Sequence, residues 1–370
     1  MKTRIRAFLS QNIVFFLSLL AAGISMCFIP PDATYATYLD YKTIACLFSV
    51  LAVVCALKNI HFFTILADKI VRQFKTARFT VLALVYITFL GSMLIANDMA
   101  LLTFLPLGYF VLQNTGNQKY MAYVFVLQNI AANLGGMLTP FGNPQNLYLY
   151  SYFSIPNGVF LKIMAAPFLI AVLLITVCCL AVPNEPLQLT KPCPYQMHWK
   201  RTVCYLLLFA LAIAIVFRTI PYWIGPGVIL AALLFLDRKA LRAVDYPLLL
   251  TFVCFFIFAG NMARLPAVQT FFASFLNKNV LLFSILSCQC ISNVPSAILL
   301  SHFTGDYPNL LRGVNIGGVG TLIASLASLI TFREYQKHHP EQTKRYLLLF
   351  SILNFSFLLI LTLCCTFLPL

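Results

Sequence analysis

The sequence predicts an all-α polytopic membrane protein that contains two repeats of inverted topology. Apolar residues make up 61% of the 370-residue chain and charged residues only 9%, against roughly 45–50% and about 25% in soluble globular proteins. Two long apolar runs carry the same interruption, Asn-x-Gly-Gly-x-x-Thr, at residues 133–139 and 315–321. Two shorter-armed apolar elements, 79–113 and 280–304, are also interrupted near their centres. We therefore expect each repeat to hold one re-entrant helical hairpin and one broken transmembrane helix.

The membrane spans follow from apolar runs of the length that crosses a bilayer, about 20 residues. In chain order they are residues 12–30, 42–58, 118–153 (broken), 157–182, 201–219, 222–236, 246–262, 308–330 (broken) and 346–368. The basic residues Lys2, Arg4 and Arg6 before the first run resemble a signal peptide. The run is longer than the apolar core of such a peptide, and many spans follow, so we expect an uncleaved first helix.

The hairpins are predicted at 79–113 and 280–304, which break at Ala96-Asn97-Asp98 and at Ser292-Asn293-Val294-Pro295. Their apolar arms run about 9 to 16 residues, which is short of a full crossing. Re-entrant hairpins therefore fit better than pairs of full spans, although the pairs of spans stay open as an alternative.

The two halves match by the order of their parts. Asp40-Tyr41 opens one span as Asp245-Tyr246 opens another, and an amphipathic segment, a hairpin, a broken helix and a plain span follow in each half. The span 201–219 carries the chain across the membrane between the halves, so the second half is inverted. The predicted divisions are 1–182 for the first repeat, 183–200 for a cytoplasmic linker, 201–221 for a connecting helix and 222–370 for the second repeat.

The distribution of basic residues orients the chain. With the N-terminus inside, six of the 25 Lys and Arg residues fall outside, and the other 19 are cytoplasmic, in agreement with the positive-inside rule. This arrangement places the C-terminus outside. The net charge of +15 is explained by these short basic loops, so nucleic acid is not an expected partner, whereas membrane lipid is. The six outside residues are Lys42, Lys162, Arg218, Arg264, Lys278 and Arg312.

The interrupted runs predict where a ligand binds. Broken backbone at bilayer depth must be buried in protein or line a cavity, and paired broken segments in two halves indicate the binding site of a secondary transporter. Unwound carbonyls and the oxygens of amides and hydroxyls suit sodium, while free N–H groups suit an anion. The candidate ligands in the broken helices are Thr139, Asn143, Asn146, Thr321 and Ser325.

Asp98 is the predicted coupling residue, together with Asn97. It is the acidic residue that lies in the middle of an apolar run, where an Asp costs about 2.5–3.5 kcal/mol and indicates function. The mirror tip offers Ser292 and Asn293 but no carboxylate, so the two halves are predicted to differ. A coupling sodium ion is expected at Asn97, Asp98 and Asn143, or a proton at Asp98. The alternative is that these tip residues only cap the helices that begin there.

Other functional classes lack a signature. None of the twelve cysteines has the spacing of a zinc site, and no nucleophile, metal-protease or phosphate-loop motif is present. We therefore predict neither an enzyme nor a bound metal or cofactor. Arg312 is expected on the outer approach to the second broken helix, where it draws anions inward or extends to the lipid interface.

These motifs resemble those of the ion transporter superfamily, which includes arsenite permeases, NhaD-type sodium/proton antiporters, citrate transporters and divalent-anion symporters. The resemblance rests on residues 96–100, 134–146 and 292–296. The sequences of these motifs are most similar to those of the short bacterial inner-membrane anion transporters of the YbiR type. It implies inverted repeats, elevator-like alternating access, a bacterial inner-membrane location and a homodimer. In the divalent-anion branch each hairpin tip carries Ser-Asn-Thr, and of these residues this chain keeps only the two asparagines and Ser292. The Asn97-Asp98 tip is more similar to that of the arsenite permeases.

We therefore predict a secondary transporter of an inorganic or small organic anion, coupled to H⁺ or Na⁺. The first alternative is a sodium/proton antiporter that uses Asp98 and carries no anion. A channel and a membrane enzyme are weaker alternatives, because the second half lacks the Asn-Pro-Ala pattern of water channels and no catalytic motif is present.

Overall fold

The computed structural model describes residues 12–186 and 195–367, and its regular structure there is helical apart from one isolated bridge between Thr76 and Pro186. The basic N-terminal residues and part of the linker 183–200 lie outside the described residues. The first half holds α2 (Ile13–Phe28), α3 (Tyr35–Tyr38), α4 (Tyr41–Asn59), α5 (Phe62–Val71), α6 (Ala77–Ile95), α7 (Asn97–Asn114), η1 (Gln118–Tyr120), α8 (Met121–Gly135), η2 (Gly136–Leu138), α9 (Pro144–Tyr152) and α10 (Asn157–Leu180).

The helix α11 (Trp199–Val216) leads into the second half. That half holds α12 (Gly225–Leu236), α13 (Arg238–Arg242), α14 (Tyr246–Ala263), α15 (Pro266–Leu276), α16 (Val280–Ile291), α17 (Asn293–Ser301), α18 (Tyr307–Ile316), α19 (Leu326–His338), η3 (Pro340–Gln342) and α20 (Thr343–Phe367).

Seven helical segments of the described chain are long and apolar enough to cross a membrane. They are Tyr41–Asn59, Ala77–Ile95, Gln118–Leu138, Asn157–Leu180, Trp199–Val216, Tyr246–Ala263 and Pro340–Phe367. Large apolar side chains on their outer faces, such as Leu173 and Leu359, are exposed, as expected where lipid replaces water. The chain is therefore an all-helical membrane protein.

One predicted span is shorter in the structure than expected. The segment 222–236 forms only α12, of 12 residues, because Pro221 and Pro226 restrict the start of the helix to the residues around Gly225. At its other end Asp237 accepts hydrogen bonds from Lys239 N and Ala240 N and begins α13. The helix α2 is also short, at 16 residues, and it borders the undescribed N-terminal residues.

The chain reverses direction at both predicted tips. Gln128 Nε2 donates to Thr88 Oγ1 (2.9 Å) and to Phe104 O (3.2 Å), so positions eight residues before and eight after Ala96 lie together. In the second half Ser287 and Ser296 are hydrogen-bonded at 2.9 Å across the break at Ser292. The arms α6 and α7 have 19 and 18 residues, longer than predicted, because both helices continue past the apolar core into polar residues at their outer ends.

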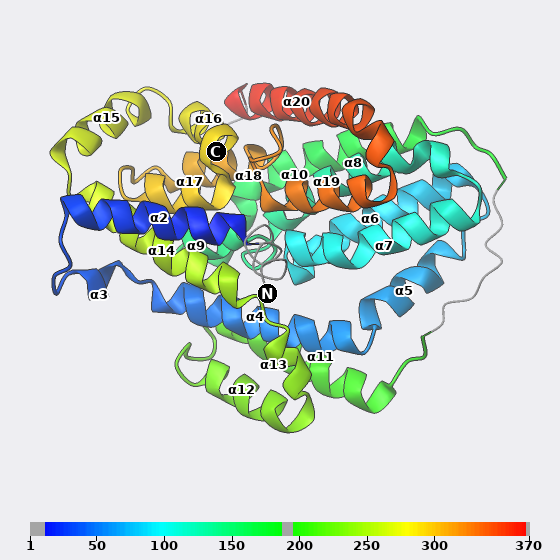
Figure 1. The fold of residues 1–370 in the computed structure, drawn as a ribbon, viewed down its shortest axis with the longest axis horizontal. Helices are drawn as coiled ribbons and strands as arrows, with labels where there is room; N and C mark the ends of the chain where they lie inside the picture. The colour runs from blue at the N-terminus through cyan, green and yellow to red at the C-terminus, as the bar shows by residue number, and fades with distance from the viewer. Residues whose placement is uncertain (1–11, 187–194, 368–370) are drawn as a thin grey trace.

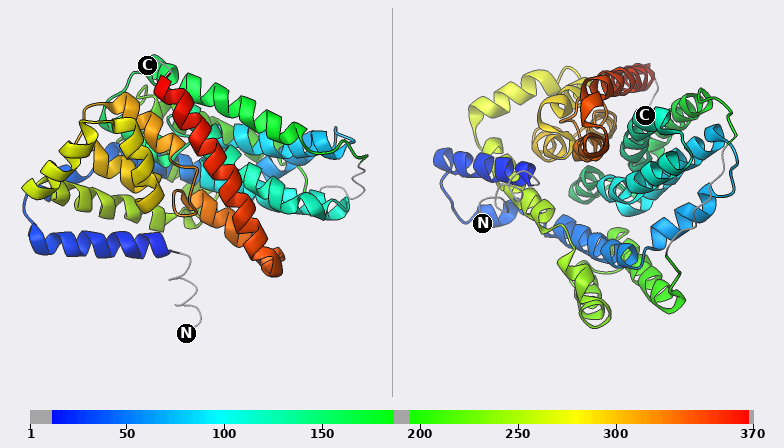
Figure 2. Two further views of the ribbon diagram at one scale, coloured as in Figure 1. Left: turned by 90° about the horizontal axis from the view of Figure 1, so that it is seen from above. Right: turned by 45° about the vertical axis from the view of Figure 1, so that its right-hand side comes forward.

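The same order of contacts occurs in both halves. The first arm α6 packs against α7 and α8, and α16 packs against α17 and α18. The opening helices are exchanged, since α2 packs against α14 and α12 packs against α4. Figure 1 shows the first hairpin with α8 at one end of the molecule and α15 to α17 at the other, and the second view in Figure 2 separates the two groups.

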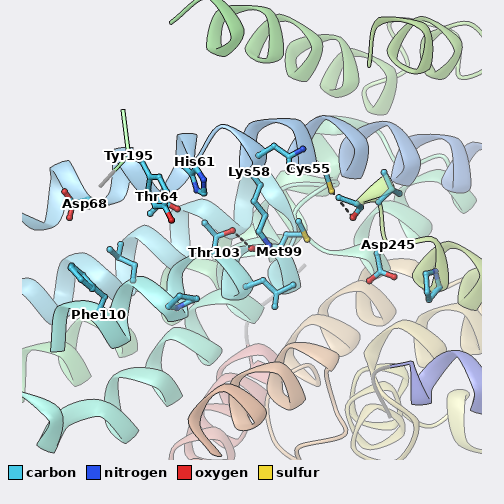
Figure 3. A pocket seen from close by; sticks show the side chains of 17 residues that line it. Cys55, Lys58, His61, Thr64, Asp68, Met99, Thr103, Phe110, Tyr195 and Asp245 are labelled. Carbon is cyan, nitrogen blue, oxygen red and sulfur yellow. Dashed lines mark hydrogen bonds between the residues drawn. The ribbon is translucent and has the colours of Figure 1, made fainter. Parts of the chain in front are cut away.

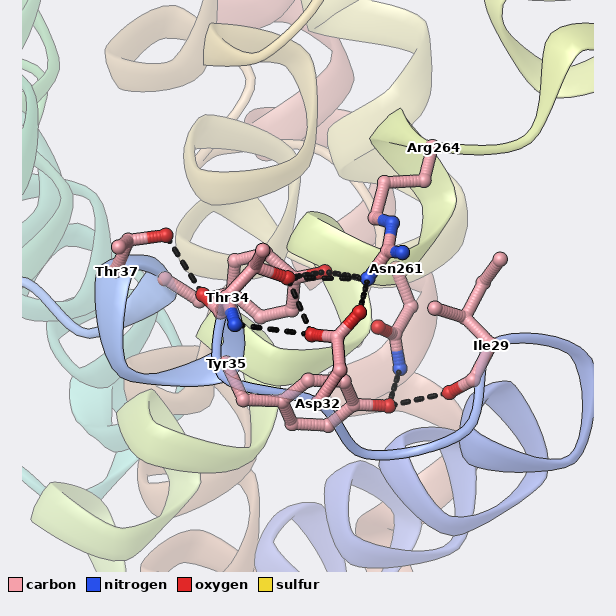
Figure 4. A network of polar contacts seen from close by, with 8 residues as sticks. Ile29, Asp32, Thr34, Tyr35, Thr37, Asn261 and Arg264 are labelled. Atoms are coloured by element: carbon pink, nitrogen blue, oxygen red, sulfur yellow. Dashed lines mark hydrogen bonds and ion pairs between the residues drawn. The ribbon is translucent and has the colours of Figure 1, made fainter.

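A polar network joins the loop after α2 to the end of α14 (Figure 4). Arg264 Nη1 contacts Asp32 Oδ2 at 2.8 Å, and Asn261 Nδ2 donates to Tyr35 Oη at 2.8 Å. The Thr34 hydroxyl donates to Asp32, and this bond and then Arg264 hold the pKa of Asp32 below its usual value. The exchanged helix α2 is therefore fixed to α14 by polar contacts as well as by packing.

This network predicts a stability that is lost in acid. Because the folded-state pKa of Asp32 is depressed, its contribution is full above the usual carboxyl pKa of about 4 and disappears as the pH falls through the folded value. We expect Asp32→Asn to lower the melting temperature of the detergent-purified protein at neutral pH, and the difference from wild type to vanish in acid. Arg264→Gln should reproduce this pattern in thermal unfolding scans. A difference that is constant with pH would contradict it.

Candidate functional site

Both hairpins break at a single residue in the same uncommon backbone conformation. Ala96 has φ 60° and ψ 148°, and Ser292 has φ 76° and ψ 158°. Such positive-φ conformations cost roughly 1–3 kcal/mol for residues other than glycine, and they persist where the surrounding structure holds them. Each break starts a new helix at the next residue, Asn97 or Asn293, whose own side-chain oxygen accepts from the following N–H.

The broken helices are tied to the hairpins by equivalent threonines. Thr139 Oγ1 donates to Met93 O at 2.6 Å, and Thr321 Oγ1 donates to Gln289 O at 3.1 Å. Each accepting carbonyl lies three residues before its tip. Gln289 makes the second attachment stronger, because its Oε1 accepts from Thr321 N at 2.8 Å. The two predicted breaks and the two predicted tips are therefore held together in the same register.

The glycines of the motif allow this close approach. A Cβ on Gly135 would lie 2.2 Å from Phe89 O and 2.6 Å from Ser92 Oγ, and one on Gly317 would lie 2.8 Å from Cys288. Both contacts join a broken helix to the first arm of its hairpin, four residues before the tip at Ser92 and Cys288. The motif thus needs glycine at these positions because another backbone or side chain occupies the space.

We expect Gly135→Ala to destabilise the protein, because the added methyl group meets a backbone carbonyl that cannot move away cheaply. Overpacking of this kind typically costs about 1–3 kcal/mol. The matched variant Gly158→Ala, in the first turn of α10, meets no atom within 4 Å and should be neutral or slightly stabilising. Melting temperatures of the two purified variants measure the difference, and equal values would contradict the close-packing argument.

Asn133 is the centre of a buried amide network between the two halves. Its Oδ1 accepts from Asn97 Nδ2 at 3.1 Å and from Ser325 Oγ at 2.7 Å. Asn315, the equivalent residue of the second motif, accepts from Asn143 Nδ2 at 3.2 Å. Each broken helix therefore donates from its loop to the first asparagine of the opposite motif.

The network is not symmetric at the tips. Asn97 reaches Asn133 with its side chain, whereas Asn293 uses its backbone N–H to donate to Ala324 O at 2.9 Å. Ser292 Oγ is 3.3 Å from the same carbonyl. The first tip is thus linked to the amide network, and the second tip is linked to the backbone of the second broken helix.

A cavity of about 590 Å³ lies against both tips. Four helices begin at its wall, since the lining includes the first residues of α7, α9, α17 and α19. Apolar side chains of α2 and α14 form the opposite wall, and the charged lining residues in the described chain are Asp98 and Arg333. The polar lining residues at the four helix starts are Asn97, Asp98, Gln145, Ser292, Asn293 and Ser325.

Several oxygens of this site are buried without a hydrogen-bond partner among the described residues. Asp98 Oδ1 and Gln145 Oε1 belong to residues that line the cavity, and Asn143 Oδ1 and Ser328 Oγ lie in the adjacent broken helices. Unpaired buried acceptors cost free energy unless a cation, water or ligand donor satisfies them. These oxygens are therefore available to a ligand of the site.

The predicted site residues divide into two groups. Asn97, Asp98, Ser292, Asn293 and Ser325 line the cavity. The other four contact protein instead: Thr139 and Thr321 bind the hairpin backbone, Asn143 binds Asn133 O and Asn315, and Asn146 binds carbonyls of residues 136, 137 and 139.

The residues that the sequence reasoning left without a role are Asn133, Asn315 and Gln289. The first two open the repeated motif, and that repetition was the available signal. Arg312 differs from its expected surface position: it is 2% exposed, and its Nε donates to Ile163 O at 3.2 Å. In the part of the chain described here, no three His, Cys, Asp or Glu side chains gather in a way that could hold a metal ion.

Two known proteins, a transporter and an inner membrane protein, are similar to this chain over most of their length. An uncharacterized transporter of Methanocaldococcus jannaschii is 31% identical over 323 residues, covering 87% of this chain and 88% of the relative. The inner membrane protein YbiR of Escherichia coli is 30% identical over 337 residues, covering 86% and 87%. The crystal structure of the Alcanivorax borkumensis YdaH transporter, described as having an unusual topology, matches with a TM-score of 0.52 at 12% identity over 96% of this chain and 97% of that one, which concerns the fold alone.

The sequence profile of the citrate transporter family matches residues 7–305. This match, with the two relatives, confirms the resemblance to the ion transporter superfamily and the prediction of a transporter in place of an enzyme. The substrate is accordingly a small molecule, and the surrounding medium is membrane lipid. The chain is an integral membrane transporter and belongs to the citrate transporter family.

Proposed function

We propose that this transporter moves a small organic or inorganic anion across the cytoplasmic membrane, coupled to H⁺ or Na⁺, by alternating access. The observation that carries the proposal is the start of four helices at one cavity. Each helix N-terminus presents the positive end of its dipole, which favours an anion. The helices have 18, 9, 9 and 13 residues. A cavity of about 590 Å³ is also within the usual range for a small-molecule site.

The same cavity offers a place for the coupling cation. Asp98 and Gln145 contribute oxygens that have no partner among residues 12–186 and 195–367, and hard cations prefer oxygen ligands from carboxylates, amides and carbonyls. Asn97 holds the tip beside Asp98, and Asn143 lies behind it with a further unpaired oxygen. A cation at Asp98 would neutralise the carboxylate and so permit an anion to bind among the helix N-termini.

We infer that the halves 1–182 and 222–370 are inverted repeats with re-entrant hairpins, joined by the linker 183–200 and the helix of 201–221. The recurring contacts and the matching threonine attachments support this division. Two ion pairs each join residues that are predicted to lie on the same side of the membrane. Lys119 pairs with Glu185 on the predicted cytoplasmic side, and Arg264 pairs with Asp32 on the predicted outer side. The N-terminus is then cytoplasmic and the C-terminus outside.

The test is an uptake screen in proteoliposomes. Citrate is the first probe because of the family, and short dicarboxylates, sulfate, phosphate and arsenite complete the panel. We expect saturable uptake of one of these anions that requires an inward proton or sodium gradient. Uptake of none of them under either gradient would overturn the proposal. The resemblance also implies a homodimer, which the mass of the purified protein in detergent measures.

A second candidate function is a sodium/proton antiporter. It is favoured by Asp98 Oδ1, which no residue of the described chain bonds, in a site where the mirror tip has no carboxylate. It requires no anion. Sodium-driven proton flux in anion-free proteoliposomes, unchanged when the anions of the panel are added, would support the antiporter and exclude the anion transporter.

A further inference from the structure

Asp98 lies in the lining of two cavities. One is the cavity of about 590 Å³ at the tips. The other is a small cavity of about 50 Å³, lined among others by Asp98, Met99, Leu102, Phe141 and Asp245. Asp98 is therefore a wall residue of both the wide site and the small cavity.

The small cavity adjoins a third, larger one. This cavity, of about 880 Å³, lies between α4, α5 and α7 and shares Met99, Leu102 and Asp245 with the small cavity. Figure 3 shows Met99 and Asp245 on its wall and Asp68 toward its opposite end. By the charge distribution above, its residues belong to the cytoplasmic half of the membrane and the linker.

The sizes of the three cavities separate what they can hold. The small cavity, of about 50 Å³, exceeds the roughly 10–15 Å³ that a water molecule needs. It is far below the roughly 300–1,000 Å³ of sites that bind organic molecules, so it suits water or a small cation better than citrate. Its two ionisable lining groups are Asp98 and Asp245, and two carboxylates repel an anion and attract a proton or a small cation. The small cavity is therefore selective by both size and charge.

The lining of the larger cavity carries both basic and acidic groups, so it does not favour cations over anions. Selection for the cation therefore takes place at the small cavity. Asp245 belongs to both, and its Oδ1 accepts from Leu248 N at 2.9 Å as the cap of α14. The titratable groups of the large cavity within the described chain are Cys55, Lys58, His61, Asp68, Tyr195 and Asp245, and those of the tip cavity are Asp98, Cys290 and Arg333.

We propose that the coupling cation passes from Asp98 to the cytoplasm by its own route, through the small cavity and past Asp245, while the anion uses the cavity at the tips. The inference rests on the proposed function, because it assigns the two substrates of that site to separate approaches. Asp245 is then a relay and positioning residue for the cation, and it does not contact the anion.

The test compares Asp245→Asn with Asp40→Asn in proteoliposomes with radiolabelled citrate, or with the anion of the panel that the wild type takes up in its place. Both residues cap the first turn of equivalent helices, α14 and α4, and asparagine keeps the cap. Asp40 lines none of these three cavities. Since a positioned carboxylate speeds proton transfer by roughly 100-fold or more, we expect Asp245→Asn to slow gradient-driven uptake at least about tenfold. Citrate–citrate exchange, which needs no net cation movement, should stay within about twofold of wild type.

A second pair of variants blocks the small cavity without changing charge. Leu102→Phe fills it from α7, and Leu94→Phe is the control, because Leu94 has a similar exposure (43% against 46%) and lines none of the cavities. We expect Leu102→Phe to slow gradient-driven uptake and to preserve exchange, and Leu94→Phe to change neither.

The outcomes separate this inference from the proposed function. A wild-type protein without gradient-dependent uptake of citrate or of any other anion in the panel would remove both. A wild-type protein with such uptake, but with Asp245→Asn and Leu102→Phe unaffected, would remove the separate cation route alone. Equal loss of exchange and gradient-driven uptake in both variants would assign the small cavity to the anion and would also overturn the inference. An equal defect in Asp40→Asn would reduce Asp245 to a helix cap.

Discussion

The variant Asp98→Asn is expected to fold and to lose accumulation of its anion almost completely. Asp98 Oδ1 has no hydrogen-bond partner among the described residues, so the amide removes a costly carboxylate without breaking a protein contact. A carboxylate within an apolar membrane segment costs up to about 2.5–3.5 kcal/mol, and we expect the variant to melt no lower than wild type. Gradient-driven uptake should fall by about 100-fold or more, as it does when a positioned proton carrier is lost.

Anion exchange in the same variant separates the two coupling ions. Asparagine resembles the neutral, protonated carboxyl group, so exchange should persist if the coupling ion is a proton. If the ion is sodium, the variant lacks a charged ligand, and exchange should fall together with accumulation. The control is Asp306→Asn, which replaces the cap of α18, a residue that lines none of the cavities described above. Accumulation at the wild-type rate in Asp98→Asn would make Asp98 a helix cap only.

The elements at the site could be predicted from the sequence because they violate local rules. Amides and a carboxylate within apolar runs located both tips, which the structure places at Ala96 and Ser292. Paired glycines before a threonine located both broken helices. In each case the local composition is incompatible with a continuous helix in lipid, so the break needs no knowledge of the rest of the fold.

Helix lengths and partners could not be predicted in the same way. Hydropathy does not show where backbone hydrogen bonding continues. The predicted lengths of the arms of the first hairpin were therefore too short, and the predicted length of α12 was too long. The exchange of α2 and α12 between halves depends on which apolar faces fit together. Arg312 shows the same limit: a basic residue near a predicted membrane surface is buried, and its Nε donates to the carbonyl of Ile163.

Within the site, the sequence identified residue types better than contacts. Asn97 and Asn143 were predicted as ligands, and both donate to the amide network. Asn133 and Asn315 were recognised only as the first residues of a motif. An amide has several donors and acceptors of equal quality, and its partners can lie far away in the sequence, as the bond from Ser325 to Asn133 across 192 positions illustrates. Such pairing is a property of the folded structure.

Asn133→Ala is the second variant with a large expected effect, on both stability and transport. The side chain accepts from Asn97 Nδ2 and Ser325 Oγ and donates to Asn129 O at 3.1 Å. Each buried polar group left without a partner costs about 1–3 kcal/mol, so a total loss of about 2–5 kcal/mol is expected. Because Asn97 is released, the tip that carries Asp98 is no longer held in place, and cation-driven uptake should be abolished.

Asn315→Ala provides the matched comparison. Asn315 accepts from Asn143 and donates to Asn146 Oδ1 at 2.6 Å and to Leu311 O at 2.8 Å, so a similar loss of stability is expected. No hairpin tip donates to it with a side chain in the described structure, since Asn293 binds Ala324 O through its backbone. Uptake should therefore fall less than in Asn133→Ala, and its dependence on the cation concentration should stay closer to wild type.

The milder variant Asn97→Ala keeps this comparison decisive if Asn133→Ala is too unstable to purify. It removes one bond to Asn133 and leaves the bond from Ser325 intact. We expect it to raise the cation concentration needed for half-maximal uptake, whereas Asn293→Ala should change mainly the apparent affinity for the anion. Equal shifts in both quantities for the two tip variants would mean that the halves are functionally equivalent. Unequal shifts in the predicted direction would mean that the cation is coupled through the first half, where Asp98 lies.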